Sequence, residues 1–508
     1  MRKIPDYIKG YGDVIHYSPR EIKKSNAFQE AKNTRRISTG ESKQLPDIDA
    51  IFDTCDIRDG SVISFQHHLR NGDYVLNKVM EVAAARNLRG LTLVASSLFP
   101  VHQPLVSHIK NGVVTKIYTS YMAGPVADAI SHGALENPVI LQTHGGRARA
   151  IENEEIVIDV AFIAAPTADF YGNLNGIQGP AACGSLGYAE VDAQWAHKVA
   201  AITDNLVPYP AFPAQITQDK VDYVVVIDQI GTASQIVSGT TRVTEDPVGL
   251  RIAQDATAII TASGLLRDGF SFQAGAGSVS LAVAKSLHRV MESKGVQGSF
   301  ASGGITKTIV DMLDSGLFRA LFDVQCFDLD AVDSYRRSAN HYSMSASLYA
   351  NPGSKGAIVD NLDVMVLGAS EVDVNFNVNV TTRSDGVIMG GSGGHADTAA
   401  GAKLAIVTTK LTASGKYPKV VENVNNITTP GETIDVVVTD YGIAVNPRNK
   451  ELISKLESAG LKLTTIQELQ RLAAEQAGVK ITEHSHQDRI VAIQEYRDGS
   501  VIDVIYQI

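Results

Sequence analysis

Short runs of apolar, largely β-branched residues recur along the whole chain and are separated by polar stretches. Runs of this length and composition, bounded by turn residues, are typical of β-strands. In the N-terminal half they cover Ser61–Phe65, Leu91–Ala95, Val139–Gln142, Ile156–Ile163 and Val199–Thr203. In the C-terminal half they cover Val221–Ile227, Asp363–Leu367, Val372–Val380, Ala405–Thr409 and Thr433–Val438.

Helical patterns alternate with these predicted strands. Apolar residues at helical spacing lie at Val279, Val283, Leu287 and Val290 before Gly295, and at Ile305, Ile309 and Met312 before Gly316. Glycine at such a position commonly ends a helix in the left-handed conformation. Pro247 is expected in the first turn of another helix that runs through Ile259. Because strands that alternate with helices form parallel sheets covered on both faces, the chain is predicted to be an α/β protein.

The length of 508 residues corresponds to about two to four domains, and two sheets fit it better than one. Residues 207–213 contain three prolines, which exclude regular structure there and suggest a boundary. We therefore expect a polar surface segment over residues 1–45, an α/β domain over 46–213 and a second over 214–508. The second is expected to end in a β-hairpin around Asp498-Gly499, with strands at Arg489–Tyr496 and Val501–Tyr506.

Composition and charge narrow the function classes. The chain has 45 Lys and Arg against 55 Asp and Glu, a formal net charge of −10, so nonspecific nucleic-acid binding is not expected. It contains no run of about 18 apolar residues, so no membrane span is expected. The 3 cysteines, Cys55, Cys183 and Cys326, do not form a disulfide pattern, and the N-terminus lacks the apolar core of a signal peptide. A cytoplasmic protein is predicted.

One glycine cluster, Gln273–Ser280, lies where a predicted helix begins. Backbone N–H groups exposed there suit a phosphate or an oxyanion. A dinucleotide fingerprint is not matched, because Ser280 replaces its third glycine and no acidic residue ends a strand about 20 positions on. A tight strand-to-helix turn is the alternative explanation.

A second cluster, Gly390–Gly394, is followed by His395 and Asp397, which could handle protons beside a closely approaching ligand. A flexible surface linker is the alternative. Further small or polar loops lie at 299–304, 143–147 and 169–173. All of these clusters are predicted at the carboxyl ends of strands, where an open α/β sheet binds ligands, so they are expected to converge on one site.

No metal site is expected. The histidine pairs at 67–68 and at His484 and His486 lack obvious companion ligands. The cysteines are predicted to be small buried apolar residues.

Together, several of these stretches make the chain resemble the citrate lyase alpha subunit family, the citrate CoA-transferase component. They are residues 64–72, 272–277, 298–304, 390–397 and 439–444. The resemblance implies two tandem CoA-transferase-type open twisted sheets with helices on both faces, and an active site between the two domains.

The resemblance also implies a reaction in which acetyl on a thioester is exchanged for citrate, giving a citryl thioester and acetate. No cofactor is then bound covalently, since a carrier protein or CoA supplies a CoA-like phosphopantetheine group. The implied partners are the acyl-carrier (gamma) subunit and the lyase (beta) subunit, which cleaves the citryl thioester.

The chain departs from the wider superfamily at the position of its glutamate nucleophile. The comparable place reads Ala301-Ser302-Gly303, with Asp311 and Asp314 following, and it contains no glutamate. The resemblance then implies that a citrate carboxylate attacks the acetyl thioester directly. A mixed anhydride forms, and the released thiolate attacks it to regenerate a thioester.

Candidate site residues lie in these loops. The predicted oxyanion and catalytic positions are Ala276, Gly277, Ser302, Gly303 and Gly304. The predicted contacts to the CoA or carrier arm are Gly390, Gly391, Gly393, Gly394, His395 and Asp397. For the citrate carboxylates we expect Arg70, Arg147, His67 and Asn173, with Arg448 as a further candidate, because carboxylates favour arginine forks.

Other functions stay open from the sequence. An acyl-CoA hydrolase, or a CoA-transferase for another short acid such as citramalate, would use the same features. A metabolite-sensing module that binds ligand without turnover is the alternative of a different class.

Overall fold

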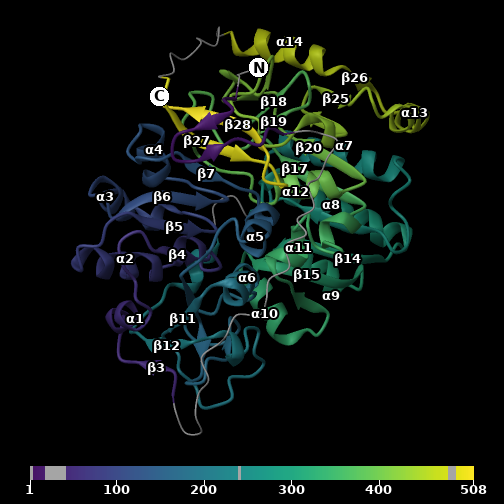
Figure 1. The fold of residues 1–508 in the computed structure, drawn as a ribbon. Helices are drawn as coiled ribbons and strands as arrows, with labels where there is room; N and C mark the ends of the chain where they lie inside the picture. Colours follow the sequence, from purple (N-terminus) through teal and green to yellow (C-terminus); the bar gives the residue numbers. More distant parts are fainter. Residues whose placement is uncertain (1–3, 18–41, 238–241, 479–487) are drawn as a thin grey trace.

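The computed structural model describes residues 4–17, 42–237, 242–478 and 488–508. Two large sheets lie side by side, one built mainly from the N-terminal half and one from the C-terminal half (Figure 1). The predicted α/β class is confirmed. Over the described residues, no helix has both the length and the apolar character needed to cross a membrane.

The first sheet has 10 strands in the order β28-β27-β7-β6-β5-β4-β8-β11-β12-β3. Every neighbouring pair is parallel except the hairpin β27–β28. The strands are β3 (Gln44–Leu45), β4 (Val62–Phe65), β5 (Leu91–Ala95), β6 (Val114–Thr119), β7 (Val139–Leu141), β8 (Val160–Ala165), β11 (Lys198–Thr203), β12 (Tyr223–Val226), β27 (Ile490–Glu495) and β28 (Val501–Tyr506).

The second sheet has 9 strands in the order β16-β15-β14-β13-β17-β20-β24-β25-β26, and only β24–β25 is antiparallel. The strands are β13 (Ser271–Ala274), β14 (Gly298–Ile305), β15 (Phe318–Cys326), β16 (His341–Ser343), β17 (Val364–Gly368), β20 (Leu404–Thr408), β24 (Val436–Thr439), β25 (Gly442–Val445) and β26 (Leu463–Thr464). Short strands outside the two sheets are β1 (Tyr7–Ile8), β2 (Gly12–Asp13), β9 (Thr167–Ala168), β10 (Leu174–Asn175), β18 (Glu371–Asp373), β19 (Val378–Asn379), β21 (Thr412–Ala413), β22 (Tyr417–Pro418) and β23 (Val420–Val421).

Helices join the parallel strands. They are α1 (Ile48–Thr54), α2 (Val75–Ala85), α3 (Leu105–Lys110), α4 (Pro125–Ser131), α5 (His144–Glu152), α6 (Gly187–Trp195), α7 (Pro247–Ala262), α8 (Ser278–Lys294), α9 (Lys307–Asp314), α10 (Leu329–Arg337), α11 (Ala346–Ala350), α12 (His395–Gly401), α13 (Lys450–Ser458) and α14 (Ile466–Ala477). Two of the predicted helices are confirmed. Pro247 lies in the first turn of α7, as expected, and α7 continues to Ala262, three residues beyond the expected Ile259. Gly295 ends α8 at a φ of 64°.

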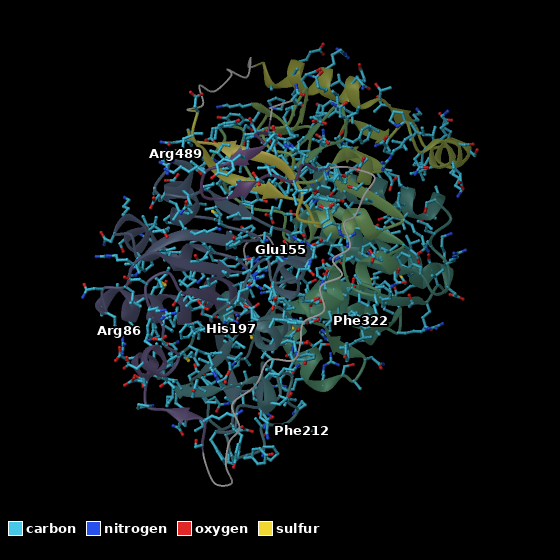
Figure 2. All side chains as sticks on the ribbon, in the orientation of Figure 1. Arg86, Glu155, His197, Phe212, Phe322 and Arg489 are labelled. Carbon is cyan, nitrogen blue, oxygen red and sulfur yellow. The ribbon has the colours of Figure 1, made fainter. Side chains whose placement is uncertain are left out.

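The division between the sheets differs from the expected boundary at residue 213. Strand β12 pairs with β11, so the proline-rich segment 207–213 is a loop within the first sheet. It carries Phe212, which is 77% exposed at the lower end of the molecule in Figure 2. The predicted C-terminal hairpin forms, but β27 pairs with β7 and therefore extends the first sheet. The chain passes to the second sheet between β12 and α7.

Two local predictions were also wrong. Residues 299–304 are not a loop but most of β14, which is held between β13 and β15. Ile305 accordingly ends a strand and does not begin a helix, and α9 starts at Lys307. The run at 372–380 forms two short strands, β18 and β19.

Candidate active site between the two sheets

The carboxyl ends of the two sheets face each other, and a largely buried cluster of polar and aromatic residues lies where they meet. The first sheet supplies His67 and Arg70 after β4, His144 at the start of α5 and Tyr188 on α6. The second supplies Gln273, Ser302, Gly303, Phe327 and Tyr349. Gln325 joins the halves, since its Nε2 donates to the carbonyl of His67 at 2.6 Å. The predicted convergence of loops from both halves is therefore observed for this part of the set.

Arg70 has three unusual properties within this cluster. Its side chain is nearly buried, with 8% of the residue exposed, and its guanidinium lies 4.4 Å from the centre of the Phe327 ring. Over the residues that the structure describes, the guanidinium has no hydrogen bond to protein and no acidic partner, and its Nε is a buried atom without a partner. Its backbone takes a φ of 52°, a strained value that clusters at functional sites. Burial lowers its pKa to about 10, so it is charged at pH 7.

The histidines beside Arg70 are neutral at pH 7. His67 and His144 lie 4.3 Å and 4.6 Å from the Tyr188 ring, between ring centres. Burial, and then the charges of neighbouring groups, lowers the pKa of His67 well below its usual value, and burial lowers that of His144 to about 3. His67 Nδ1 is 2.6 Å from Ser96 Oγ. The site therefore contains one fixed positive charge among neutral rings.

The second sheet contributes a short hydrogen-bond relay. Ser302 Oγ donates to Gln273 Oε1 at 2.9 Å, and Gln273 Nε2 donates to Tyr349 Oη at 2.7 Å. The bare backbone of Gly303 makes room for the Gln273 amide. A Cβ at position 303 would lie 2.4 Å from Gln273 Nε2, and the φ of 100° there favours glycine as well. The relay fixes the orientation of the Gln273 amide beside the site.

Ala276 and Gly277 lie at the start of α8, as predicted. Gly277 is the residue before the first helical turn, and no side chain caps the helix there. The first amides of the helix are thus without intrahelical partners. Gly304, by contrast, packs its backbone against the Phe327 ring within β14.

The 390–394 cluster has a packing role that the sequence did not indicate. Gly393 N donates to Ser120 O at 3.0 Å, and His144 N donates to Gly393 O at 2.8 Å. A Cβ at Gly391 would lie 2.4 Å from Ser120 O. Gly391 and Gly393 therefore lie where the backbones of the two halves come into close contact. Their predicted contact to the CoA or carrier arm stays a prediction.

His395 and Asp397 are likewise engaged by protein groups. The ring nitrogens of His395 lie 2.7 Å from Thr429 Oγ1 and 2.9 Å from Gly368 O, and burial lowers its pKa to about 4. Asp397 accepts hydrogen bonds from Thr143 Oγ1 and Gly145 N, both at 2.9 Å. Burial raises the pKa of Asp397 to about 6. Its carboxylate joins α12 to the N-terminus of α5.

Three expected citrate ligands are already bound to protein groups. Arg147 forms a two-pronged ion pair with the buried carboxylate of Asp192, at 2.7 and 2.8 Å. Asn173 Nδ2 donates to Asp169 and Gln218, and its Oδ1 accepts from Gln218 N. Arg448 lies 3.8 Å from Asp435 on a partly exposed loop of the second sheet. Of the arginines considered, Arg70 alone is left for a ligand.

Over the described residues, one group of side chains brings possible metal-ligand atoms close together, and His67 and His68 are not part of it. Asp323, Cys326 and His341 place possible ligand atoms within 4.8 Å of one another. They also bond to each other, since Asp323 Oδ2 lies 2.9 Å from Cys326 Sγ and 3.1 Å from His341 Nε2. His484 and His486 lie outside the described residues.

Tyr188, Tyr349 and Phe327 belong to the site but were not predicted from the sequence. A tyrosine in a helix and a phenylalanine after a strand look like ordinary core residues, so no local signal marked them. Gln273 lies in the glycine cluster, but the sequence gives no sign of its role. That role depends on the hydrogen bonds of its amide to Ser302 and Tyr349, which are distant in the chain.

Known proteins of similar sequence are citrate lyase alpha chains. The family model described as citrate lyase, alpha subunit (CitF) matches residues 42–508. The citrate lyase alpha chain of Escherichia coli (strain K12) is 46% identical over 488 residues, covering 95% of this chain and 94% of its own length. That of Klebsiella pneumoniae is 48% identical over 452 residues, covering 89% of each chain.

Comparison with solved structures also finds a citrate lyase alpha subunit. A chain assigned as the alpha subunit of citrate lyase from Streptococcus mutans, in complex with citrate, has a TM-score of 0.94 at 44% identity and covers 100% of this chain and 99% of its own. A Pseudomonas malonate decarboxylase hetero-tetramer in complex with malonate has a TM-score of 0.63 at 17% identity, covering 88% of this chain and 90% of the other. The second match shows a shared fold alone.

Proposed function

The chain belongs to the citrate lyase alpha-subunit family, and on that premise we propose that it exchanges acetyl for citrate on a thioester, with Arg70 holding a citrate carboxylate. The resemblance predicted from the sequence is thereby confirmed. The chain is the citrate CoA-transferase component, a transferase, and a subunit of a multi-subunit enzyme.

One observation carries the proposal, the unpaired charge of Arg70. A buried cation without a partner is costly, and a carboxylate that docks on it recovers this cost through charge-assisted hydrogen bonds. The guanidinium lies between Phe327 and Phe99, with ring centres 4.4 Å and 5.4 Å away. Apolar faces of this kind exclude water and strengthen the attraction between the guanidinium and a bound anion.

The chemistry requires no nucleophile from the protein. Over the described residues, the buried carboxylates of this region, Asp73, Asp192, Asp323 and Asp397, all accept hydrogen bonds from protein groups. In keeping with the family resemblance, we assign the attack to citrate itself. One oxygen of a citrate carboxylate bonds to the acetyl carbonyl carbon, and the carbon–sulfur bond breaks. The released thiolate then attacks the citryl carbonyl of the mixed anhydride, and acetate leaves with the bridging oxygen.

The contribution of the protein is position and charge. Binding both reactants in one orientation removes much of the entropic barrier. The open amides at Ala276-Gly277 and the Gln273 amide are the donors that we assign to the developing oxyanions, since preorganised donors of this kind stabilise tetrahedral intermediates. The neutral His67 and Tyr188 rings pack beside Arg70 without competing for the carboxylate.

The partners are those of the family. We propose that an acyl-carrier (gamma) subunit delivers the acetyl group on its CoA-like phosphopantetheine arm, and that a lyase (beta) subunit cleaves the citryl product. No cofactor is then bound covalently to this chain. Free acetyl-CoA should replace the loaded carrier in the purified chain.

The test uses the purified chain with acetyl-CoA and citrate. We expect citryl-CoA and acetate in equal amounts, measured by mass spectrometry. Arg70→Gln should raise the KM for citrate by about 10- to 100-fold, the loss expected for hydrogen bonds to a charged group, and should leave that for acetyl-CoA nearly unchanged. Absence of product with both acetyl-CoA and the acetylated carrier refutes the proposed reaction, and an unchanged citrate KM refutes the role of Arg70.

A further inference from the structure

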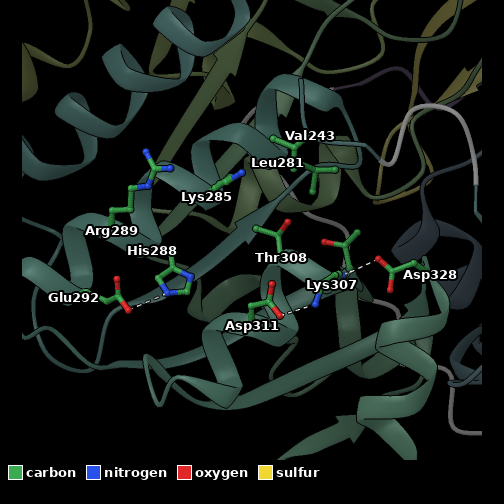
Figure 3. A pocket seen from close by; sticks show the side chains of 11 residues that line it. Val243, Leu281, Lys285, His288, Arg289, Glu292, Lys307, Thr308, Asp311 and Asp328 are labelled. Atoms are coloured by element: carbon green, nitrogen blue, oxygen red, sulfur yellow. Dashed lines mark hydrogen bonds and ion pairs between the residues drawn. The ribbon is translucent and has the colours of Figure 1, made fainter. Parts of the chain in front are cut away.

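A pocket outside the candidate active site is lined by residues that directly follow β14 and Phe327. It is a pocket of about 550 Å³ between α8 and α9, lined by side chains of both helices (Figure 3). Its volume lies in the range of sites for small molecules and cofactors. Thr306 follows β14 directly, and Asp328 follows Phe327, so the pocket and the candidate active site share these short stretches of chain.

Two cations in this pocket are free. Lys285 and Arg289 lie one turn apart on α8, and neither has a hydrogen bond or ion pair to any residue that the structure describes. Figure 3 shows both side chains along the same side of the helix. The other charged groups are occupied. Lys307 Nζ lies 2.9 Å from Asp311, His288 Nε2 lies 3.2 Å from Glu292, and Asp328 accepts from Lys307 N and Ala331 N.

An unpartnered hydroxyl lines the same pocket. Thr306 precedes the first turn of α9 and is only 3% exposed, yet its Oγ1 has no hydrogen-bond partner and does not cap the helix. Buried hydroxyls are rarely left unsatisfied, so this one is able to bond to a water, an ion or a polar ligand group in the pocket. A helix N-terminus also favours anions, and phosphates in particular.

From these contacts we infer that the pocket binds the phosphate-bearing nucleotide end of the thioester donor. Lys285 and Arg289 would pair with the phosphate oxygens, and the Thr306 hydroxyl would donate to one of them. This inference rests on the proposed function, because the thioester end must then reach Arg70 past the Ser302–Gly304 and Phe327 segments. Free CoA and a carrier-bound arm share this phosphate chemistry.

Direct binding tests the pocket without using activity. ADP is titrated calorimetrically into the full chain and into Lys285→Ala, Arg289→Ala and Thr306→Val. We expect binding by the wild type and a loss of about tenfold in affinity for each cation variant, the effect of one charge-assisted contact. Lys110→Ala, a change at an exposed lysine on α3 with no partner in the described chain, should bind like the wild type. Absence of ADP binding, or equal affinity in all variants, overturns the inference.

Kinetics separate the pocket from the reaction site. With acetyl-CoA, Lys285→Ala and Arg289→Ala should raise the KM for the donor, and with acetyl-pantetheine, which has no phosphate, they should have no effect. An equal effect on both donors would indicate a structural role and overturn the inference. If the effect extends to the acetylated carrier, the carrier arm uses the pocket; if it is confined to acetyl-CoA, only the free nucleotide does. If the wild-type chain transfers no acyl group but binds ADP, and the pocket variants weaken that binding, the proposed reaction is refuted. The assignment of the pocket as a phosphate site then still holds.

Discussion

Arg147 and Arg70 look alike in the sequence, and their predicted responses to substitution are opposite. Arg147 Nη1 and Nη2 lie 2.7 and 2.8 Å from the two carboxylate oxygens of Asp192, and the two side chains are 3% and 0% exposed. Asp192 also accepts from Gln66 at 2.6 Å. In Arg147→Met the carboxylate of Asp192 stays buried and loses its cation.

The size of the stability loss in Arg147→Met follows from the burial of this ion pair. Removing one partner of a buried ion pair costs about 3–5 kcal/mol. Unfolding entropy is about 2 cal/mol/K per residue, so a chain of this length should lose roughly 3–5 °C in melting temperature. Arg86→Met is the matched control. Arg86 pairs with Asp49 and Asp53 at the surface, where the two carboxylates are 57% and 74% exposed, so its melting temperature should change by less than about 1 °C.

The assay is calorimetric unfolding of the variants, followed by citrate kinetics at a temperature where all of them are folded. Arg147→Met should melt early with a near-normal citrate KM, whereas Arg70→Gln should show the reverse. A normal melting temperature in Arg147→Met together with a raised citrate KM would refute the structural role given to Arg147.

Two glycines and one buried histidine give further predictions. Gly303→Ala places a Cβ 2.4 Å from Gln273 Nε2 at a φ of 100°. It should therefore displace the Gln273 amide and lower kcat with both acetyl-CoA and the acetylated carrier. A folded variant with wild-type kcat would show that the hydrogen-bond relay is dispensable. Gly391→Ala brings a Cβ to 2.4 Å from Ser120 O and should lower the melting temperature. Scanning calorimetry tests this against Gly356→Ala, a position where a Cβ would have no neighbour within 4 Å. Burial lowers the pKa of His395 to about 4 in the folded chain. Between about pH 6.5 and 4, the unfolded chain therefore binds more protons at this residue than the folded chain does. The contribution of neutral His395 to stability is lost as the pH falls through that window. Urea midpoints at pH 7 and pH 5 should differ less in His395→Gln than in the wild type, and an unchanged difference contradicts this.

The fold was largely predictable where local pattern decides it. The β-branched runs became β5 and β7. Pro247 marked the start of α7, and Gly295 marked the end of α8. Strand β14 was missed because residues 298–304 are mostly Gly, Ser and Ala, and their extended form comes from pairing with β13 and β15. The pairing of β27 with β7 joins segments about 350 residues apart, which no local pattern encodes.

Part of the candidate site follows from local pattern. The stretches 273–280 and 143–147 lie at the carboxyl ends of β13 and β7, as parallel topology predicts, whereas 299–304 is itself a strand. Which arginine is free depends on partners distant in the chain, such as Asp192 for Arg147. Gly391 and Gly393 lie at a close contact between the two halves. In the sequence, a glycine that lets two backbones approach looks the same as a glycine that lets a ligand approach.

The central claim, direct attack by a citrate carboxylate, is tested by the fate of oxygen in one turnover. The enzyme in excess is mixed with acetyl-CoA and citrate labelled with ¹⁸O in its carboxylates, and the acetate is analysed by mass spectrometry. We predict that acetate from the first turnover carries one ¹⁸O, because the bridging oxygen of the anhydride comes from citrate. Unlabelled acetate, with ¹⁸O transferred to a protein carboxylate, would contradict the direct route and show a covalent enzyme intermediate.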